Sequence, residues 1–297
     1  YWINPTTCEV SRLLAGAVDL GWGWVADANL SGDTITLLTP EWSSASTSTI
    51  YRLKYLDVAN GSLSDGISLP VDQNFWIYNI VLGSNEVFAL GWANSVGYTL
   101  RKFDKASGFS TDFGSFSGDY QWGSLVLDPS GNALSMVFSR YDENSNKWVY
   151  FVKKISTFDG TTISQVPLVG DWPYFNAFAL ASSNQAFGLR SYGWSESGET
   201  IALLSVDFQT GSITQVNADL LPPGRFYSYN SFIISLNGQE AFFQSHNGFW
   251  GNIQLHKIRL SDGASLSAQE IAGPNSYVYF ARLFESPGRF LYAKRTG

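Results

Sequence analysis

The sequence has few of the residues that build disulfides, redox sites and metal centres. Its 297 residues include one cysteine, Cys8, and two histidines, His246 and His256. A single cysteine excludes an internal disulfide, a Cys-x-x-Cys redox motif and a cysteine-based zinc site. The histidines lie in different segments without a His-Glu-x-x-His pattern or a neighbouring pair of carboxylates. They therefore predict no zinc site, and we expect no cofactor.

Charge and long apolar runs are also scarce. Charged residues make up 14% of the chain, the net charge is −7, and no cluster of lysine and arginine stands out. This excludes nucleic-acid binding through a basic face. No run of eighteen apolar residues is present, so we expect no membrane span. The chain begins at Tyr1 rather than Met, which indicates a processed or trimmed product and favours an extracellular or cell-surface location.

Aromatic residues are abundant and recur at regular intervals. Six of them each open a short apolar run that ends about eight residues later in a small polar turn: Trp24, Trp76, Trp122, Phe175, Tyr229 and Tyr279. Successive members are separated by 52, 46, 53, 54 and 50 residues. A period near fifty without a helical pattern predicts repeated antiparallel sheets.

A second series of strands, offset from the first, has the same period. Each strand alternates apolar and polar residues and enters a turn whose last residue is glycine, at Gly61, Gly108, Gly160, Gly211 and Gly263. Such a turn needs a residue with positive φ, which glycine adopts without strain. Each unit therefore contains two hairpins, or four strands.

The two ends of the chain complete each other in this scheme. The last unit supplies one hairpin, from Tyr279 to Ala293, while the first residues supply a second, with Cys8 at the position of the glycine. We therefore expect one domain over 1–297, in which the N- and C-terminal hairpins close the last blade and leave few unpaired edges. The expected blades are 19–70, 71–118, 119–170, 171–222, 223–272, and 273–297 together with 1–18.

The strand-and-turn units resemble those of a known fold family. Tyr51–Gly61, Tyr98–Gly108 and Ile201–Gly211 each run through an Asp into a turn that ends in Gly. This is similar to the six-bladed β-propellers with TolB-like and YVTN-like repeats, although the turn Asp is absent at Ser156 and Arg259. The resemblance implies an all-β, six-bladed propeller of four-stranded antiparallel blades. It carries over no catalytic residue, because propellers host many functions.

The segments between the second and third strands of the units contain the candidate ligand-binding residues. Each of five such loops holds a tryptophan among Ser, Asn, Glu, Gln or Tyr, which gives the set Trp42, Trp92, Trp148, Tyr192, Trp194 and Trp250. Exposed rings of this kind suit sugars or proteins. The alternative is that the tryptophans fold over the outer blade surface. The six strand-opening aromatics either line the central funnel or pack between neighbouring blades.

Two weaker patterns involve polar loops. Asp142, Glu143 and Asn144 place oxygen-bearing side chains in one loop, which makes a weak calcium candidate against the alternative of a solvated turn. Asn29 and Asn60 begin glycosylation triplets on predicted hairpin turns. No nucleophile elbow stands out, and a Ser-His-Asp triad stays open because triads are defined by geometry rather than by order.

These observations favour a non-enzymatic binding module of a secreted or cell-surface protein, with a glycan or a protein as its ligand. A structural or assembly subunit that associates with itself or a partner is the first alternative. An enzyme, such as a lyase or hydrolase that works through carboxylates and tyrosines in the central funnel, is the second.

Overall fold

The computed structural model describes the residues that form the sheets and most of the turns between them. These are residues 2–3, 10–11, 26–31, 33–43, 48–69, 74–94, 96–116, 120–128, 130–169, 177–195, 198–227, 232–235, 237–248, 251–274, 276–283 and 290–296. The regular secondary structure of these residues is β, as the sequence predicts.

Five antiparallel sheets are each built from one continuous stretch of chain. The first contains β3 (Asp27–Ser31), β4 (Thr34–Ser43), β5 (Ser48–Asp57) and β6 (Leu63–Leu69). The second contains β7 (Phe75–Leu82), β8 (Glu86–Ala93), β9 (Gly97–Asp104) and β10 (Ser110–Phe116). The third contains β11 (Tyr120–Leu127), β12 (Ala133–Asp142), β13 (Lys147–Ser156) and β14 (Thr162–Pro167). The fourth contains β15 (Ala177–Leu180), β16 (Gln185–Ser195), β17 (Gly198–Asp207) and β18 (Ile213–Asn217). The fifth contains β19 (Arg225–Tyr227), β20 (Ile233–Ile234), β21 (Glu240–Asn247), β22 (Ile253–Arg259) and β23 (Ser265–Ala272).

A further sheet joins the two ends of the chain in the order β2-β1-β25-β24. Its strands are β1 (Trp2–Ile3), β2 (Val10–Ser11), β24 (Ser276–Leu283) and β25 (Phe290–Thr296). Trp2 lies opposite Leu291 and Ile3 opposite Phe290, so the predicted pairing of the chain ends is present. The two N-terminal strands are only two residues long. The count of six blades therefore depends on this narrow sheet, whereas the other five sheets are blades of ordinary width.

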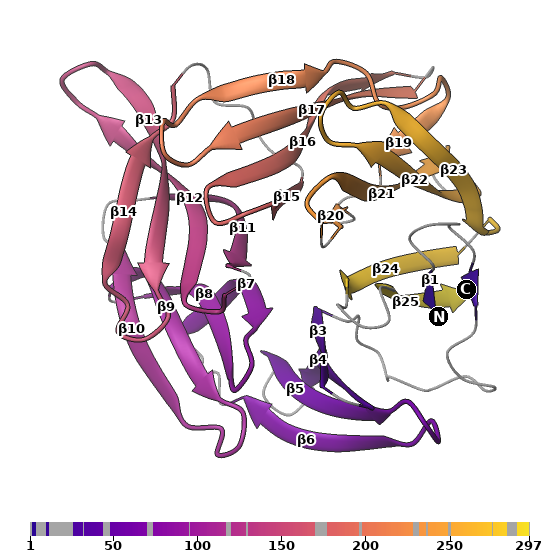
Figure 1. The fold of residues 1–297 in the computed structure, drawn as a ribbon. Coiled ribbons are helices and arrows are strands. Elements are labelled where there is room, and N and C mark those ends of the chain that lie inside the picture. The colour runs from indigo at the N-terminus through magenta and orange to yellow at the C-terminus, as the bar shows by residue number, and fades with distance from the viewer. Residues whose placement is uncertain are drawn as a thin grey trace.

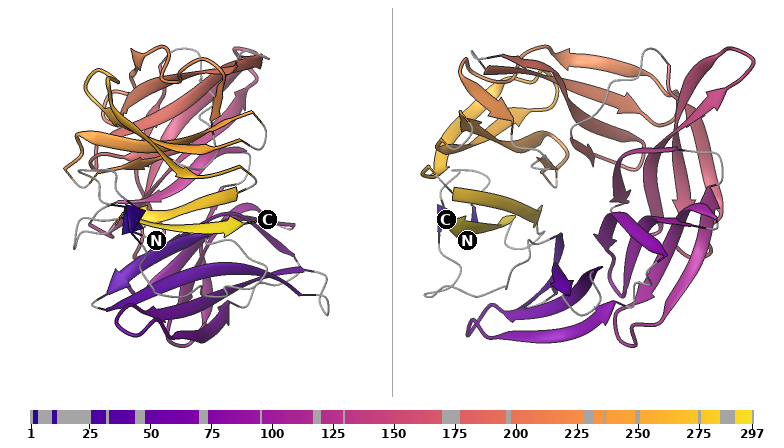
Figure 2. Two further views of the ribbon diagram at one scale, coloured as in Figure 1. Left: turned by 90° about the vertical axis from the view of Figure 1, so that its right-hand side faces the viewer. Right: turned by 180° about the vertical axis from the view of Figure 1, so that it is seen from behind.

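The sheets are arranged radially as a propeller (Figure 1). Each innermost strand contacts the next, in the order β3, β7, β11, β15, β20 and β24, and β24 also contacts β3. The view from behind shows the same ring, in which strands from both ends of the chain belong to one sheet (Figure 2). Because neighbouring strands are antiparallel, each innermost strand starts at the end where the second and third strands join. We call this end of the propeller the 2–3 face.

Core side chains lie mainly between neighbouring blades. Phe88 of β8 and Leu100 of β9 belong to the same buried cluster as Phe138 of β12 and Phe151 of β13. A second cluster joins β16 and β17 to β21 and β22. Burial of these rings and aliphatic chains is the main favourable contribution to the assembly of the ring.

The repeated turn glycines have two structural reasons. Gly61, Gly108, Gly160, Gly211 and Gly263 all have positive φ, as predicted, between 68° and 75°. In addition, a Cβ atom at Gly160 would lie 1.5 Å from the carbonyl oxygen of Phe113, and one at Gly211 would lie 1.9 Å from that of Pro167. Both carbonyls belong to the preceding blade. The glycine therefore allows the turn of one blade to contact the outer part of its neighbour.

The turn aspartates orient the backbone, and the two departures from the pattern keep part of this role. Asp207 Oδ1 accepts hydrogen bonds from the backbone N–H groups of the second and third residues after it, at 2.7 and 2.9 Å. At Ser156 the serine hydroxyl takes the place of the aspartate carboxylate and accepts a hydrogen bond from the backbone N–H of Phe158 at 3.2 Å. At the other departure, Arg259 forms an ion pair with Asp262 at 3.0 Å.

One predicted turn residue lies in a strand. Asn29 is part of β3 and pairs with Thr36, so the prediction that it lies on a hairpin turn is wrong. Pairing continues as far as Ser31 opposite Thr34, because two residues are enough to close a hairpin. Asn60, in contrast, lies on the exposed turn after β5, as predicted.

Candidate functional site

The structure describes the side chains of some of the candidate aromatics. Trp76, Trp92, Trp148 and Tyr192 are described in full. Backbone positions alone are described for Trp42 in β4, Trp122 in β11, Trp194 in β16 and Tyr279 in β24. Trp24, Phe175, Tyr229 and Trp250 lie outside the described residues.

Four aromatic residues of the second blade form a cluster at the 2–3 face. Trp76, Trp92 and Tyr98 are cross-strand partners on β7, β8 and β9, so their side chains lie on one side of the sheet. The rings of Trp92 and Tyr98 meet edge to face, with centroids 5.1 Å apart and an interplanar angle of 87°. The ring centroids of Tyr78 and Tyr98 are 5.7 Å apart. We call these four residues the β7–β9 aromatic cluster.

The cluster has a supporting part and an exposed part. Trp92 and Tyr98 are half-buried, whereas Trp76 and Tyr78 are 60% and 53% exposed. The exposed pair belongs to the innermost strand, β7, which lies near the centre of the ring (Figure 1). Trp76, expected either between blades or in the funnel, is therefore largely accessible to solvent.

The third blade presents an exposed aromatic pair on the same face. Tyr141 and Trp148 lie opposite each other at the end of the β12–β13 hairpin. Their centroids are 5.5 Å apart, and both side chains are more than 40% exposed. The Tyr141 hydroxyl donates to the side-chain oxygen of Asn146. The two rings thus contact each other while both side chains remain partly exposed to solvent.

The fourth blade contributes Tyr192, which is 48% exposed. The guanidinium of Arg190 lies 4.5 Å from the centre of its ring. The Tyr192 hydroxyl donates to Gln215 Oε1 at 2.6 Å. These two contacts hold the ring in place while one part of it stays accessible, so aromatic surface extends over three consecutive blades.

The polar loop that made the calcium candidate is a tight turn between β12 and β13. Asp142 accepts hydrogen bonds from the Ser145 hydroxyl at 2.6 Å and from the Asn144 N–H at 3.1 Å. The Ser145 hydroxyl is the main reason why the pKa of Asp142 lies below its usual value. Within the described ranges, no three His, Cys, Asp or Glu side chains lie close enough together to hold a metal ion. Asp142 thus has hydrogen-bond partners within its own turn, and Glu143 is exposed beside it.

One histidine forms a polar contact that the sequence analysis missed. His256 Nε2 lies 2.6 Å from Ser245 Oγ, to which Arg225 Nε donates at 2.7 Å. The hydroxyl proton of Ser245 is then directed to His256, which is neutral. Burial and the charge of Arg225 lower the pKa of His256 to about 4. Ser245 is fully buried, so this pair cannot present a nucleophile to a substrate.

The other histidine is held locally. His246 Nδ1 contacts the backbone oxygen of Gly248, and its ring stacks on Phe226 with centroids 5.8 Å apart. It lies on the opposite side of β21 from Ser245, since successive residues of a strand point to opposite faces. The two histidines therefore belong to separate environments.

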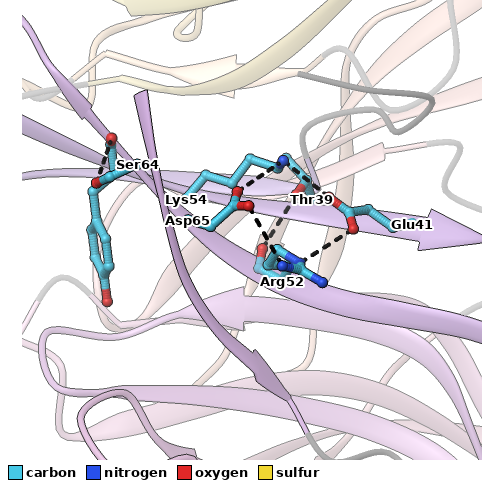
Figure 3. A network of polar contacts seen from close by, with 7 residues as sticks. Thr39, Glu41, Arg52, Lys54, Ser64 and Asp65 are labelled. Carbon is cyan, nitrogen blue, oxygen red and sulfur yellow. Dashed lines mark hydrogen bonds and ion pairs between the residues drawn. The ribbon is translucent and has the colours of Figure 1, made fainter. Parts of the chain in front are cut away.

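Charged side chains of the first blade neutralise one another (Figure 3). Lys54 Nζ lies 3.0 Å from Glu41 Oε1 and 3.2 Å from Asp65 Oδ1, and Arg52 Nε lies 3.2 Å from Glu41 Oε2. Burial acts to lower the pKa of Lys54, but its hydrogen bonds and charge interactions with the two carboxylates outweigh burial and raise it. Such a network stabilises the outer strands and leaves neither carboxylate of this group isolated as a general base.

The glycosylation candidates differ in their secondary structure. Asn60 is exposed, its Nδ2 donates to Asp57 Oδ2 at 2.8 Å, and its Oδ1 accepts the N–H of Ser62 at 2.7 Å. Asn29 lies within a paired strand. Asn60 is therefore the better placed of the two acceptors.

The comparisons with known proteins identify a fold and no family. No protein-family model matches the chain, and no curated protein matches it in sequence. A solved structure described as TolB from Agrobacterium tumefaciens is 10% identical, covers 99% of this chain and 96% of its own, and gives a TM-score of 0.60. Oligogalacturonate lyase in complex with manganese gives 0.50 at 10% identity over 80% of this chain. This chain spans only 63% of that lyase, less than two thirds of its length.

A third similar structure belongs to another functional class. Acylaminoacyl peptidase from Pyrococcus horikoshii gives a TM-score of 0.52 at 10% identity, over 92% of this chain and 49% of its own. At such low identity the likeness shows the propeller fold alone. Among the described residues, no helix is long and apolar enough to cross a membrane.

Proposed function

We propose that this protein is a non-enzymatic recognition module whose ligand, a glycan or a protein, binds on the 2–3 face. The observation that carries the proposal is the exposed aromatic surface of three consecutive blades: Trp76 and Tyr78, Tyr141 and Trp148, and Tyr192. Large exposed apolar rings gathered on one face of a protein usually mark a binding site. Each of these groups is also held by a neighbouring ring or hydrogen bond, which lowers the entropy lost when a ligand binds.

The described polar groups favour binding over catalysis. Glu41 and Asp65 are paired with cations, Asp142 is engaged within its own turn, and Ser245 is buried. A nucleophile or general base has to reach the substrate. A lyase or hydrolase reaction in the funnel would therefore have to use groups other than these.

We further propose that the sheet of the two chain ends acts as the sixth blade of a single domain and that the protein works outside the cell or at its surface. The contacts of β24 with β3 and β20 support the first point. The exposed acceptor triplet at Asn60 supports the second. Within the ligand-binding set, Trp194 and Trp250 are expected to contribute strongly, with Trp42 as a further member.

Self-association is the second candidate function, because apolar side chains are also exposed on the rim of the third blade. Ile163 and Val169 are 55% and 65% exposed along or beside the outer strand β14. An edge strand with unpaired backbone groups can pair with another chain. Light scattering distinguishes self-association from ligand recognition. Assembly through the rim makes the measured mass increase with protein concentration, and Ile163→Lys should remove that increase.

The recognition function is tested by the dependence of binding on exposed rings. Wild type, Trp148→Ala, Tyr192→Ala and Phe158→Ala are compared on an oligosaccharide array and against defined candidate proteins. Phe158 is the matched control, because it is 87% exposed but lies in the turn between β13 and β14, at the other end of the blades. We expect the first two variants to lose affinity and the control to keep it. A ligand that binds all four proteins equally well contradicts the proposal.

A further inference from the structure

We infer that the β7–β9 aromatic cluster is a binding subsite for an uncharged carbohydrate. This inference rests on the proposed recognition function and specifies the ligand class at one place on the 2–3 face. The exposed rings of Trp76 and Tyr78 are the stacking surface, and Trp92 and Tyr98 are the residues that support it.

The supporting residues contact the ring of Tyr78 and pair with the backbone of Trp76. The ring centroid of Tyr98 lies 5.1 Å from that of Trp92 and 5.7 Å from that of Tyr78. Trp76 is the cross-strand partner of Trp92, so its backbone position is fixed by the same row. A side chain that is already ordered loses little conformational entropy on binding, which matters for a ligand as weakly binding as a sugar.

Trp76 and Tyr78 are two residues apart on β7, a spacing that directs side chains to the same side of a strand. The pairing of β7 with β8 shifts between Ile77 and Asn79, so that Tyr78 occupies a β-bulge. Bulges re-aim side chains and are frequent at binding sites. On β8, a Cβ atom at Gly91 would lie 2.6 Å from the backbone oxygen of Trp76 and 2.6 Å from the ring of Phe75. The absence of a side chain at Gly91 thus allows the close approach that holds this part of β7 in place.

The charge of the two segments that carry the cluster points to a neutral ligand. The chain contains 18 lysine and arginine and 25 aspartate and glutamate residues, yet Phe75–Leu82 and Gly91–Tyr98 contain none of them. A protein ligand at a specific interface usually meets a polar rim with complementary charges. An uncharged sugar needs no such partners, because it combines apolar C–H groups on the face of its ring with hydroxyls around its edge.

Hydrogen-bonding groups flank the rings. The N–H of Asn94 donates to the carbonyl oxygen of Asn74 at 3.2 Å, which brings these two exposed residues together at the start of β7. Their side-chain amides can both donate and accept, as sugar hydroxyls can. A flat ring beside amide and phenol groups is the combination that recognises a sugar ring by its face and its edge together.

The test uses uncharged hexasaccharides of β-1,4-linked glucose, mannose and xylose, with oligogalacturonate of the same length as the anionic probe. Binding is measured by calorimetry for wild type, Trp76→Ala, Trp76→Phe and Phe158→Ala. We expect at least one neutral hexasaccharide to bind, Trp76→Ala to weaken it at least tenfold, Trp76→Phe to retain part of the affinity, and Phe158→Ala to change nothing. Oligogalacturonate is expected to bind at least tenfold more weakly.

Two results overturn the inference: no neutral hexasaccharide binds at millimolar concentration, or its affinity survives Trp76→Ala within twofold. Near-ultraviolet circular dichroism of each variant shows whether the aromatic packing is intact, and Trp76→Phe serves as the informative variant if Trp76→Ala unfolds. A third outcome is that no hexasaccharide binds, while a defined protein binds with an affinity that depends on Trp148 and Tyr192. In that case the carbohydrate assignment is wrong and the recognition function stands. If no ligand depends on any exposed ring, both are wrong.

Discussion

Ser245 Oγ lies 2.6 Å from Nε2 of His256, inside the packing between the fourth and fifth blades. His256 stacks on Phe243 with ring centroids 4.8 Å apart, and the guanidinium of Arg225 holds the same hydroxyl from the other side. A second positive charge on His256 would face Arg225 in a site that water cannot reach. The pair therefore links the stability of this interface to pH.

The first prediction is a loss of stability as the pH falls from about 6.5 to about 4. The pKa of His256 is lowered from 6.5 to about 4 in the folded protein. Between these two pH values the histidine binds more protons in the unfolded chain than in the native state, so the free energy of unfolding decreases as the pH decreases. At 1.36 kcal/mol per unit, the loss is on the order of 3 kcal/mol. Urea denaturation of wild type and His256→Gln at a series of pH values measures it. Equal slopes for the two proteins would contradict the prediction.

The second prediction separates the two reasons for a turn glycine. Gly131 and Gly160 both have a φ of +75°, but a Cβ atom at Gly131 meets nothing within 4 Å, whereas one at Gly160 meets the backbone of Phe113. Gly131→Ala should cost about 1 kcal/mol through backbone strain. Gly160→Ala should cost about 3 kcal/mol or more, because the neighbouring blade has to move as well. If chemical denaturation shows similar losses in the free energy of unfolding for the two variants, the contact between blades contributes little to stability.

The third prediction concerns the sheet that joins the chain ends. Removing residues 1–14 takes away β1 and β2 and leaves β25 with an unpaired edge. We expect a clearly lower melting temperature and a greater tendency to aggregate. Ile3→Pro is the milder companion variant, since proline cannot donate a backbone hydrogen bond. Truncated and full-length proteins that melt together would exclude a sixth blade closed by the termini.

The fourth prediction is that the protein keeps its melting temperature when metal ions are removed. The Asp142 turn is held by its own hydrogen bonds, so exhaustive chelation should change the melting temperature by less than about 1 °C. Differential scanning calorimetry with and without chelator measures the effect. A large decrease that calcium reverses, and that Asp142→Asn prevents, would establish an ion site in this loop.

Features encoded within short segments could be predicted from the sequence. The turns that end at Gly61 and Gly211 follow from local chemistry, in which an aspartate binds the backbone and a glycine supplies positive φ. Asn29 is the counterexample, because the sequence does not show how far strand pairing continues toward a turn. The spacing of these turns was sufficient to predict four-stranded blades.

The site was less predictable, since exposure depends on what packs against a residue from other strands. Trp92 and Trp148 are predicted in equivalent loops, but the structure places them in paired strands, on β8 and β13. Trp92 is half-buried against Tyr98, whereas Trp148 is 44% exposed. Trp76 belongs to the strand-opening set and is more exposed than either. The contact of Ser245 with His256 joins two strands of one hairpin. It depends on the register of that hairpin, in which His256 lies opposite Phe243, two residues from Ser245.

The last prediction distinguishes tryptophans that support the fold from those that bind. Trp92 packs against Tyr98 within the cluster, so Trp92→Ala should lower the free energy of unfolding by about 1–3 kcal/mol. Trp148 lies beside Tyr141 at the end of a hairpin and is 44% exposed, so Trp148→Ala should change stability by about 0.5 kcal/mol or less. The same variant should weaken ligand binding at least tenfold, which corresponds to about 1.4 kcal/mol. Denaturation and calorimetric titration of the two variants give both quantities. If Trp148→Ala unfolds the blade, or leaves binding untouched, Trp148 belongs to the scaffold and the ligand contacts the 2–3 face elsewhere.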